Sequence, residues 1–140
     1  MPLTRPEAGC GAVIYNERQE LLLIQRLRAP EALHWGLPGG KIDFGEPVKT
    51  AVAREIREEL GIEIEVGRLA CLTETIGADD GRHWVAPVYL ATILSGTPAI
   101  LEPEKHADWG WFALDALPDP LTTPTQQYLA HRAALRETLQ

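Results

Sequence analysis

Apolar runs alternate with polar turns through the first forty positions of the chain. Residues 8–15 and 21–27 are rich in small, aliphatic and β-branched side chains, and the polar segment 16–20 lies between them. Two such runs joined by a short polar turn are typical of a β-hairpin. Residues 28–34 are then expected to form a loop, and residues 35–40 a short strand that runs into a Pro/Gly turn.

The clearest helical pattern follows this turn. Pro47 suits the first position of a helix, because its missing N–H would have no partner there. Good helix formers continue to Leu60, and Gly61 provides a left-handed C-terminal stop. A second helix is expected at about residues 123–137. Its apolar positions include Tyr128, Leu129, Ala133 and Leu135.

Further strands are expected in the second half of the chain. Residues 62–75 and 84–94 have the composition of strands joined by a turn at 77–81, and residues 109–113 are expected to form a last strand. Strands with one helix in the middle and one at the end predict an α/β fold with a sheet covered on both faces. The 140 residues contain no repeat or linker, so one domain spanning 1–140 is expected.

Composition narrows the class of protein. The net charge of −7, from 20 acidic and 13 basic residues, argues against an electrostatic grip on nucleic acid. The sequence contains no run of eighteen apolar residues, so no membrane span is expected. Residues 1–7 lack the apolar run of a secretory signal. Cys10 and Cys71 lie far apart. They could form one disulfide, but two buried thiols in a reducing cytoplasm are expected.

The middle helix carries an unusual set of acids. Glu55, Glu58 and Glu59 fall on one arc, because positions three and four apart are neighbours on a helix. Their repulsion is only partly offset by Arg54 and Arg57. A hard divalent cation such as Mg²⁺, which prefers oxygen ligands, would offset the rest. A solvated acidic face with i,i+4 partners is the alternative on composition alone.

The turn before this helix changes the balance between these alternatives. Gly39 and Gly40 allow the backbone to approach a ligand closely, so a carbonyl of this turn could join a metal shell. A simple tight turn would also explain the two glycines.

Taken together, residues 40–62 resemble the Nudix box, a motif of nine defined positions spread over 23 residues. Every defined position carries the residue type that the motif requires. These positions are Gly40, Glu46, Arg54, Glu55, Ile56, Glu58, Glu59, Gly61 and Ile62. The resemblance implies the Nudix fold, an α/β/α sandwich around a mixed β-sheet.

The resemblance also implies roles for particular residues. Mg²⁺ would be the cofactor, with Mn²⁺ as a substitute. Its expected ligands are the Gly40 carbonyl, Glu55, Glu58 and Glu59. Arg54 and Glu46 match the family's orienting pair, which holds loop and helix together through a charged contact. The residues expected to act in catalysis are Glu46, Arg54, Glu58, Glu59 and Glu104.

The general base is sought in the acidic segment before the late tryptophan strand. Glu102 and Glu104 are both candidates there, and Glu104 is favoured, with a glutamate of the box as the fallback. Both acids could instead be ordinary loop residues. His34 and His106 show no ligand spacing and are expected to lie in loops.

Substrate contacts are predicted outside the box. Arg26 or Arg28 could contact phosphate, or either could be solvated, and Gly39 lies where the backbone could approach the substrate. Four tryptophans offer surfaces for base stacking. Trp84, next to His83, is the one expected at a pocket mouth.

The activity implied by the resemblance is MutT-like: Mg²⁺-dependent hydrolysis of a nucleoside triphosphate, ordinary or oxidised, to nucleoside monophosphate and pyrophosphate. The short chain and the Glu-Pro-Glu-Lys segment favour this activity. A nucleoside-diphosphate conjugate (ADP-ribose, a sugar nucleotide or a dinucleoside polyphosphate) is the alternative substrate. A non-catalytic module that senses a nucleotide is a hypothesis of another class. A homodimer is possible.

Overall fold

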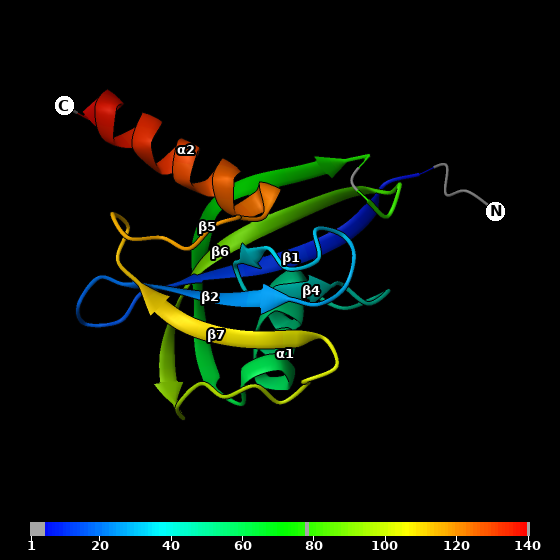
Figure 1. Cartoon of the computed structure of the whole chain (residues 1–140), viewed down its shortest axis with the longest axis horizontal. Coiled ribbons are helices and arrows are strands. Elements are labelled where there is room, and N and C mark those ends of the chain that lie inside the picture. Colours follow the sequence, from blue (N-terminus) through cyan, green and yellow to red (C-terminus); the bar gives the residue numbers. More distant parts are fainter. Residues whose placement is uncertain (1–4, 78, 140) are drawn as a thin grey trace.

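A computed structural model describes residues 5–77 and 79–139. Residues 1–4, 78 and 140 lie outside the described residues, and with them part of the N-terminal segment and of the turn expected at 77–81. The strands are β1 (Glu7–Ile14), β2 (Leu21–Arg26), β3 (Trp35–Gly36), β4 (Gly39–Lys41), β5 (Glu63–Ile76), β6 (His83–Ser95) and β7 (His106–Phe112). The helices are α1 (Val48–Leu60) and α2 (Thr123–Leu139) (Figure 1).

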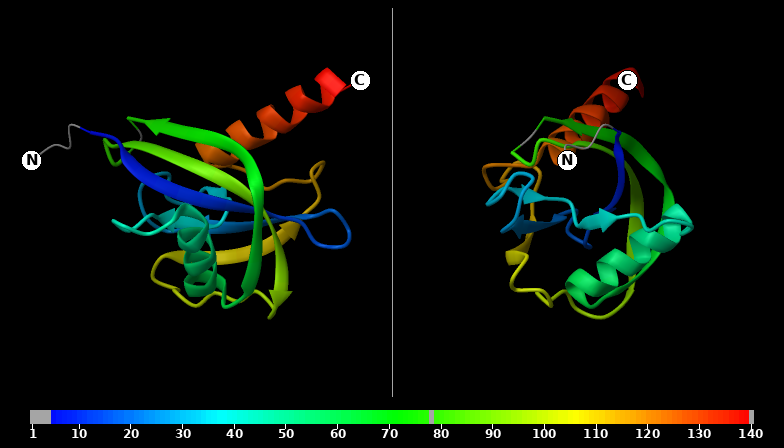
Figure 2. Two further views of the ribbon diagram at one scale, coloured as in Figure 1. Left: turned by 180° about the vertical axis from the view of Figure 1, so that it is seen from behind. Right: turned by 90° about the vertical axis from the view of Figure 1, so that its right-hand side faces the viewer.

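The strands form two sheets that pack against each other (Figure 2). The first has the order β4-β1-β6-β5, with β1 and β6 parallel and the other neighbours antiparallel, so it is mixed. The second has the order β3-β2-β7 and is antiparallel. The helices α1 and α2 lie on opposite sides of the sheets (Figure 1). The predicted α/β architecture around a mixed sheet is confirmed.

The predicted hairpin of residues 8–15 and 21–27 is wrong. Within the described chain, β1 and β2 share only the isolated antiparallel bridge between Tyr15 and Leu21. The reason is that both edges of β1 are used by distant strands, β6 along most of its length and β4 at Gly9–Gly11. A strand that is apolar on both faces does not reveal its neighbours, and here long-range pairing replaced the local pair.

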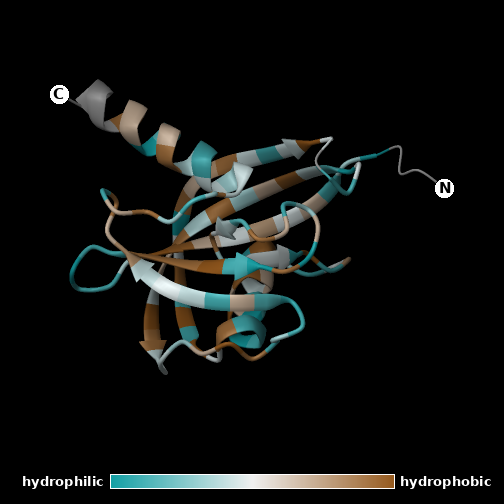
Figure 3. Ribbon diagram, in the orientation of Figure 1, coloured by the Kyte–Doolittle hydropathy of each residue, from teal (hydrophilic) through white to brown (hydrophobic). Residues whose placement is uncertain are grey.

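Successive residues of β1 and β2 point into two different cores, as the two-residue period of a strand requires. Ala12 and Leu22 pack against α1, whereas Val13 and Leu21 pack in the cluster that contains Tyr128 of α2. Figure 3 shows the resulting hydrophobic colour along both strands, and β2 turning hydrophilic at its end. Each strand is therefore buried on both faces, with one helix over each core.

The first helix begins one residue later than predicted. Pro47 precedes it with ψ 145°, an extended conformation, so helical backbone starts at Val48. At the other end Gly61 has φ 71°, and its N–H donates to the Arg57 carbonyl, as the predicted left-handed stop requires. The helix buries Ala51, Val52, Ile56 and Leu60, and with them Glu59.

The last strand, β7, starts earlier than predicted. It begins at His106 rather than at 109, because His106 and Asp108 pair with Arg26 and Gln25 of β2. His106 is buried at 7% exposure, so its expected place in a loop is wrong. Polar residues at the start of the strand concealed it from the apolar pattern.

Two expectations from composition can be compared with the described residues. Cys10 and Cys71 are both buried free thiols there, as expected. No helix in this part of the chain is long and apolar enough to cross a membrane.

Candidate active site

The acidic face of α1 has a gradient of burial. The side chain of Glu58 is 50% exposed, that of Glu55 is 16% exposed, and that of Glu59 is only 3% exposed. The buried end of this gradient faces the turn before α1, where the Gly39 N–H donates to Glu59 Oε1 at 3.2 Å. Gly40 lies directly against the Glu55 carboxyl group, and any side chain at position 40 would collide with it. The structure thus places the glycine turn beside Glu55 and Glu59, and Glu58 lies at the exposed end of the same helix face.

Arg54 connects the loop before α1 to the carboxylates of the helix. Its Nε and Nη2 donate to the two carboxylate oxygens of Glu46 at 2.7 and 2.9 Å, and Nη2 also donates to the Lys41 carbonyl. Its Nη1 donates to Glu55 at 3.0 Å and to Glu58 at 3.2 Å. The two-pronged hydrogen bond from Arg54 lowers the pKa of Glu46. The charged contact expected between Arg54 and Glu46 is present, and it joins the loop to the helix.

The surroundings of Glu59 within the described residues disfavour the charged form of its carboxyl group. Burial raises its pKa well above the usual value, and the negative charges of Glu55 and Glu102 raise it further, against the hydrogen bond from Gly39. Glu59 Oε2 finds no hydrogen-bond partner among the described residues. A buried carboxylate with a free oxygen is costly unless another group supplies a positive charge.

A divalent cation fits this donor set. Carboxylate and carbonyl oxygens are the ligands that hard cations such as Mg²⁺ prefer. As the side chains stand, no three His, Cys, Asp or Glu side chains of residues 5–77 and 79–139 converge on one point that could hold a metal ion. Arg54 instead donates to both Glu55 and Glu58. To hold a cation together with Glu59, these two side chains would have to turn away from Arg54.

A cavity of about 300 Å³ adjoins the acidic face. Gly39 and Gly40 line one part of it, and Thr73 and Thr75 of β5 line another, together with Trp84 of β6. The indole N–H of Trp84 donates to Asp80 Oδ2 at 3.0 Å, which fixes the orientation of the ring. The three residues predicted to contact substrate, Arg26, Gly39 and Trp84, therefore line a single cavity.

Arg26 is a half-buried cation on the lining of this cavity. Its Nε donates to the Pro30 carbonyl at 2.7 Å, so the loop after β2 holds the guanidinium in place. Burial lowers the pKa of Arg26, and the negative charge of Glu59 opposes this effect most strongly. Arg28, the other arginine considered for phosphate contact, is exposed and is not among the described residues that line the cavity.

The two candidate bases have different surroundings. Glu104 is exposed. The Glu102 side chain is 24% exposed, pairs with Lys105 at 3.2 Å, and raises the pKa of both Glu55 and Glu59 by its negative charge. The lower exposure of Glu102 therefore favours it over Glu104, the candidate that the sequence favoured.

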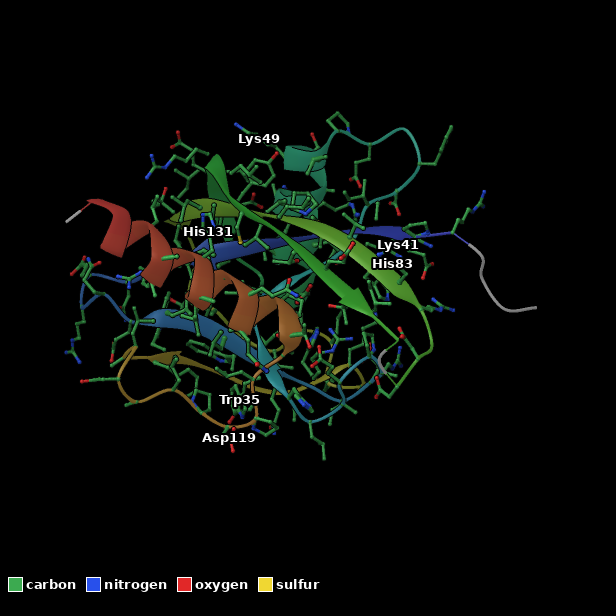
Figure 4. The ribbon with its side chains drawn as sticks, turned by 90° about the horizontal axis from the view of Figure 1, so that it is seen from above. Trp35, Lys41, Lys49, His83, Asp119 and His131 are labelled. Atoms are coloured by element: carbon green, nitrogen blue, oxygen red, sulfur yellow. The ribbon has the colours of Figure 1, made fainter. Side chains whose placement is uncertain are left out.

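Several residues near the cavity escaped the sequence argument. Thr73 and Thr75 alternate as buried polar residues on β5, and this period of two was a signal that could have identified them. Lys41 also lines the cavity and lies with His83 at one end of the molecule (Figure 4). His83, expected near the pocket mouth, pairs with Glu74 at 3.0 Å.

Trp109 and Trp111 lie in the strand β7, and their rings contact each other edge to face, with centroids 6.3 Å apart. Trp35 packs in the same manner on Phe112, at 5.1 Å. These three rings pack against the hydrophobic cores. Trp84 is the tryptophan that lines the cavity, among the residues described.

Comparisons with known proteins identify relatives of this chain. The 8-oxo-dGDP phosphatase of Homo sapiens is 34% identical over 128 residues, which are 88% of this chain and 37% of the relative. A putative 8-oxo-dGTP diphosphatase of Mycobacterium tuberculosis is 53% identical over 111 residues, covering 66% of this chain and 77% of the relative. The chain spans about a third of the length of the 8-oxo-dGDP phosphatases that it matches.

A solved structure is similar over nearly the whole fold. The crystal structure of a MutT NUDIX hydrolase from Burkholderia pseudomallei has a TM-score of 0.86 and 55% sequence identity, and the match covers 91% of this chain and 98% of that chain. The family pattern described as NUDIX domain matches residues 5–138. The resemblance predicted from residues 40–62 is confirmed, and the chain belongs to the Nudix family of hydrolases.

Proposed function

We propose that this Nudix hydrolase uses Mg²⁺, or Mn²⁺ in its place, to hydrolyse a nucleoside triphosphate to a nucleoside monophosphate and pyrophosphate. The proposal rests on the turn that lies between the cavity and the acidic face of α1. Gly39 and Gly40 line the cavity and also contact Glu59 and Glu55. A nucleoside held in the cavity would therefore direct its phosphates toward the acidic face of α1.

The cation would be held by Glu55, Glu58, Glu59 and the Gly40 carbonyl. Bound there, it would neutralise charge on the phosphate oxygens and acidify a water molecule. Arg54 would keep Glu46 and the loop in register with the helix, through the bonds at 2.7 and 2.9 Å. The negative face of α1 would repel a phosphate chain without the cation, so activity is expected to depend fully on metal.

The proton of the attacking water needs an acceptor, and we assign this role to the segment that contains Glu102 and Glu104. Its partial burial, and its negative charge, which raises the pKa of both Glu55 and Glu59, support Glu102. Glu102→Gln and Glu104→Gln form a matched pair of variants. We expect the first to lower kcat by about 10²–10⁴-fold, the usual contribution of a general base, and the second to leave it nearly unchanged. The reverse result would restore Glu104 as the base.

The cavity supports a substrate with one nucleoside. Its volume of about 300 Å³ lies at the lower end of the range for ligand sites, so a conjugate that carries a second sugar or base would extend outside it. The Trp84 ring offers a face for the base, and Arg26 and Lys41 are the two cations on the lining. The name of the Mycobacterium tuberculosis relative supports a triphosphate with an oxidised guanine base.

A nucleoside diphosphate is the second candidate, because the human relative is named an 8-oxo-dGDP phosphatase. The same cavity and acidic face would serve a diphosphate, since the nucleoside is unchanged. The two candidates differ in products: a triphosphate yields monophosphate and pyrophosphate, whereas a diphosphate yields monophosphate and inorganic phosphate.

A substrate panel tests the proposal. The protein would be incubated with Mg²⁺ and ordinary or 8-oxo nucleoside triphosphates and diphosphates, ADP-ribose, sugar nucleotides and dinucleoside polyphosphates, and the products separated by ion-exchange chromatography. Pyrophosphate from triphosphates, abolished by EDTA and by Glu59→Gln, is the expected result. Turnover of the conjugates alone would refute the substrate class. Nucleotide binding without any turnover would favour the sensor hypothesis.

A further inference from the structure

His106 occupies a place that neither the Nudix box nor the apolar pattern indicates. It is the first residue of β7 and pairs in register with Arg26 at the end of β2. The backbone N–H of His106 donates to the Glu102 carbonyl at 3.0 Å, so the turn that carries the candidate bases ends directly at His106. Its ring lies below the surface, with the residue 7% exposed.

The ring faces the most buried carboxylate of α1. His106 Nε2 lies 3.6 Å from Glu59 Oε2, in contact but beyond hydrogen-bond distance. Each side chain also has a buried polar atom, Glu59 Oε2 and His106 Nδ1, without a hydrogen-bond partner among the described residues. Such atoms are rare in folded proteins. Two of them on one contacting pair indicate that the pair has a role besides stabilising the fold.

The two oxygens of Glu59 thus have different neighbours. Oε1 accepts the Gly39 N–H at 3.2 Å, and Oε2 faces the imidazole. Contacts on both oxygens restrict rotation of the carboxylate about its last bond. Carboxylates that bind metal are commonly hydrogen-bonded to a second group, and losing that group weakens metal affinity. The imidazole is the side chain placed to supply this bond to Oε2 after a small shift.

The charged groups that act on the ring come from the turn before β7 and from β2. Glu102 and Glu104 act on it with negative charge, and Arg26 and Lys105 with positive charge. Nε2 is the ring atom that faces Glu59, and an imidazole nitrogen can carry an N–H directed at a carboxylate oxygen.

We propose that His106 is a positioning residue that holds the Glu59 carboxylate in the orientation needed to bind the divalent cation. This inference rests on the proposed function, because it assumes that Glu59 is a metal ligand. It assigns no chemical step to His106.

Metal binding in solution tests the inference separately from activity. The Mn²⁺ affinity of the full chain would be measured from the electron paramagnetic resonance signal of the free ion, without nucleotide. We expect His106→Leu to weaken Mn²⁺ binding by about 10–100-fold, and His106→Gln, whose amide nitrogen reaches the Nε2 position, to stay within about threefold of the parent. The Tm of His106→Leu in EDTA should not fall below that of the parent, because the substitution replaces an imidazole that has an unpartnered nitrogen with an apolar side chain.

The control variants separate the possible failures. His131→Leu, an exposed substitution on α2, should leave Mn²⁺ binding unchanged. Unchanged Mn²⁺ affinity in His106→Leu, beside a clear loss in Glu59→Gln, would overturn the role of His106 and leave the metal site standing. Unchanged affinity in Glu59→Gln would overturn the metal site and this inference with it. If His106→Leu does not fold, His106→Asn replaces it, because its amide does not reach the Nε2 position. Equal affinities of the Asn and Gln variants would then refute the inference.

Discussion

Glu59→Gln should stabilise the metal-free protein while it weakens metal binding. Glu59 is 2% exposed, and its Oε2 has no hydrogen-bond partner in the described structure. A buried polar atom left unsatisfied costs about 1–3 kcal/mol, and more when charged. Glutamine keeps an oxygen for the Gly39 N–H and removes the charge. We therefore expect a gain of about 1–3 kcal/mol in the free energy of unfolding in EDTA, roughly 3–9 °C in Tm.

The sign of the pH dependence follows from the raised pKa of Glu59 in the folded protein. Below the unfolded value of 4.5 the carboxyl group is protonated in both states and the variant gains nothing from removing its charge. As the pH rises, the unfolded chain releases this proton first, so the parent loses stability until the folded pKa is passed. The advantage of Glu59→Gln should therefore be smaller at pH 4.5 than at pH 7.5.

Thermal and urea unfolding in EDTA at these two pH values, read by circular dichroism, measure the effect. Glu58→Gln is the matched control: its half-exposed i,i+4 pair with Arg54 predicts a loss of about 0.3–0.5 kcal/mol, opposite in sign. Added Mg²⁺ should stabilise the parent more than Glu59→Gln and narrow the gap. A destabilised Glu59→Gln at pH 7.5 would show that the buried charge is balanced within the protein, and a gain equal at both pH values would show that the charge is not the cause of the gain.

Three further substitutions test other parts of the site. Gly40→Ala would place a methyl group against the Glu55 carboxyl group, so we expect kcat to fall by about 10²-fold with the circular dichroism spectrum unchanged; normal turnover would show that the close approach is dispensable. Arg54→Lys loses the two-pronged contact with Glu46 and should lower the free energy of unfolding by about 1–2 kcal/mol in urea melts, and no loss would contradict the orienting role. Trp84→Leu removes a stacking surface worth about 1–3 kcal/mol, so KM should rise by roughly 10–100-fold with a smaller change in kcat, and an unchanged KM would place the base elsewhere.

The sequence predicted the parts of the fold that depend on local chemistry. The first helix and its stop at Gly61 follow from propensity and from a residue that accepts positive φ. The burial of Glu59 was also accessible, because Val52 and Ile56 precede it at helical spacing on the same face. The pairing of strands was not accessible: β1 and β2 are apolar on both faces, and such strands carry no local signal that chooses between neighbours.

The site divides in the same way. The carboxylates and the turn glycines were predicted because one helix and the turn before it bring them together. His106 and the threonines of β5 approach the site only through strand pairing and long-range packing. Burial favours Glu102 over Glu104 as the base, and the spacing of the two residues in the chain carries no such signal.

A crystal structure with Mn²⁺ and a non-hydrolysable α,β-methylene analogue of dGTP would show where metal and nucleotide bind. We expect an anomalous peak within bonding distance of Glu55, Glu58, Glu59 and the Gly40 carbonyl, with the phosphates beside it and the base in the cavity against Trp84. Metal and nucleotide bound away from α1 would refute the proposed site.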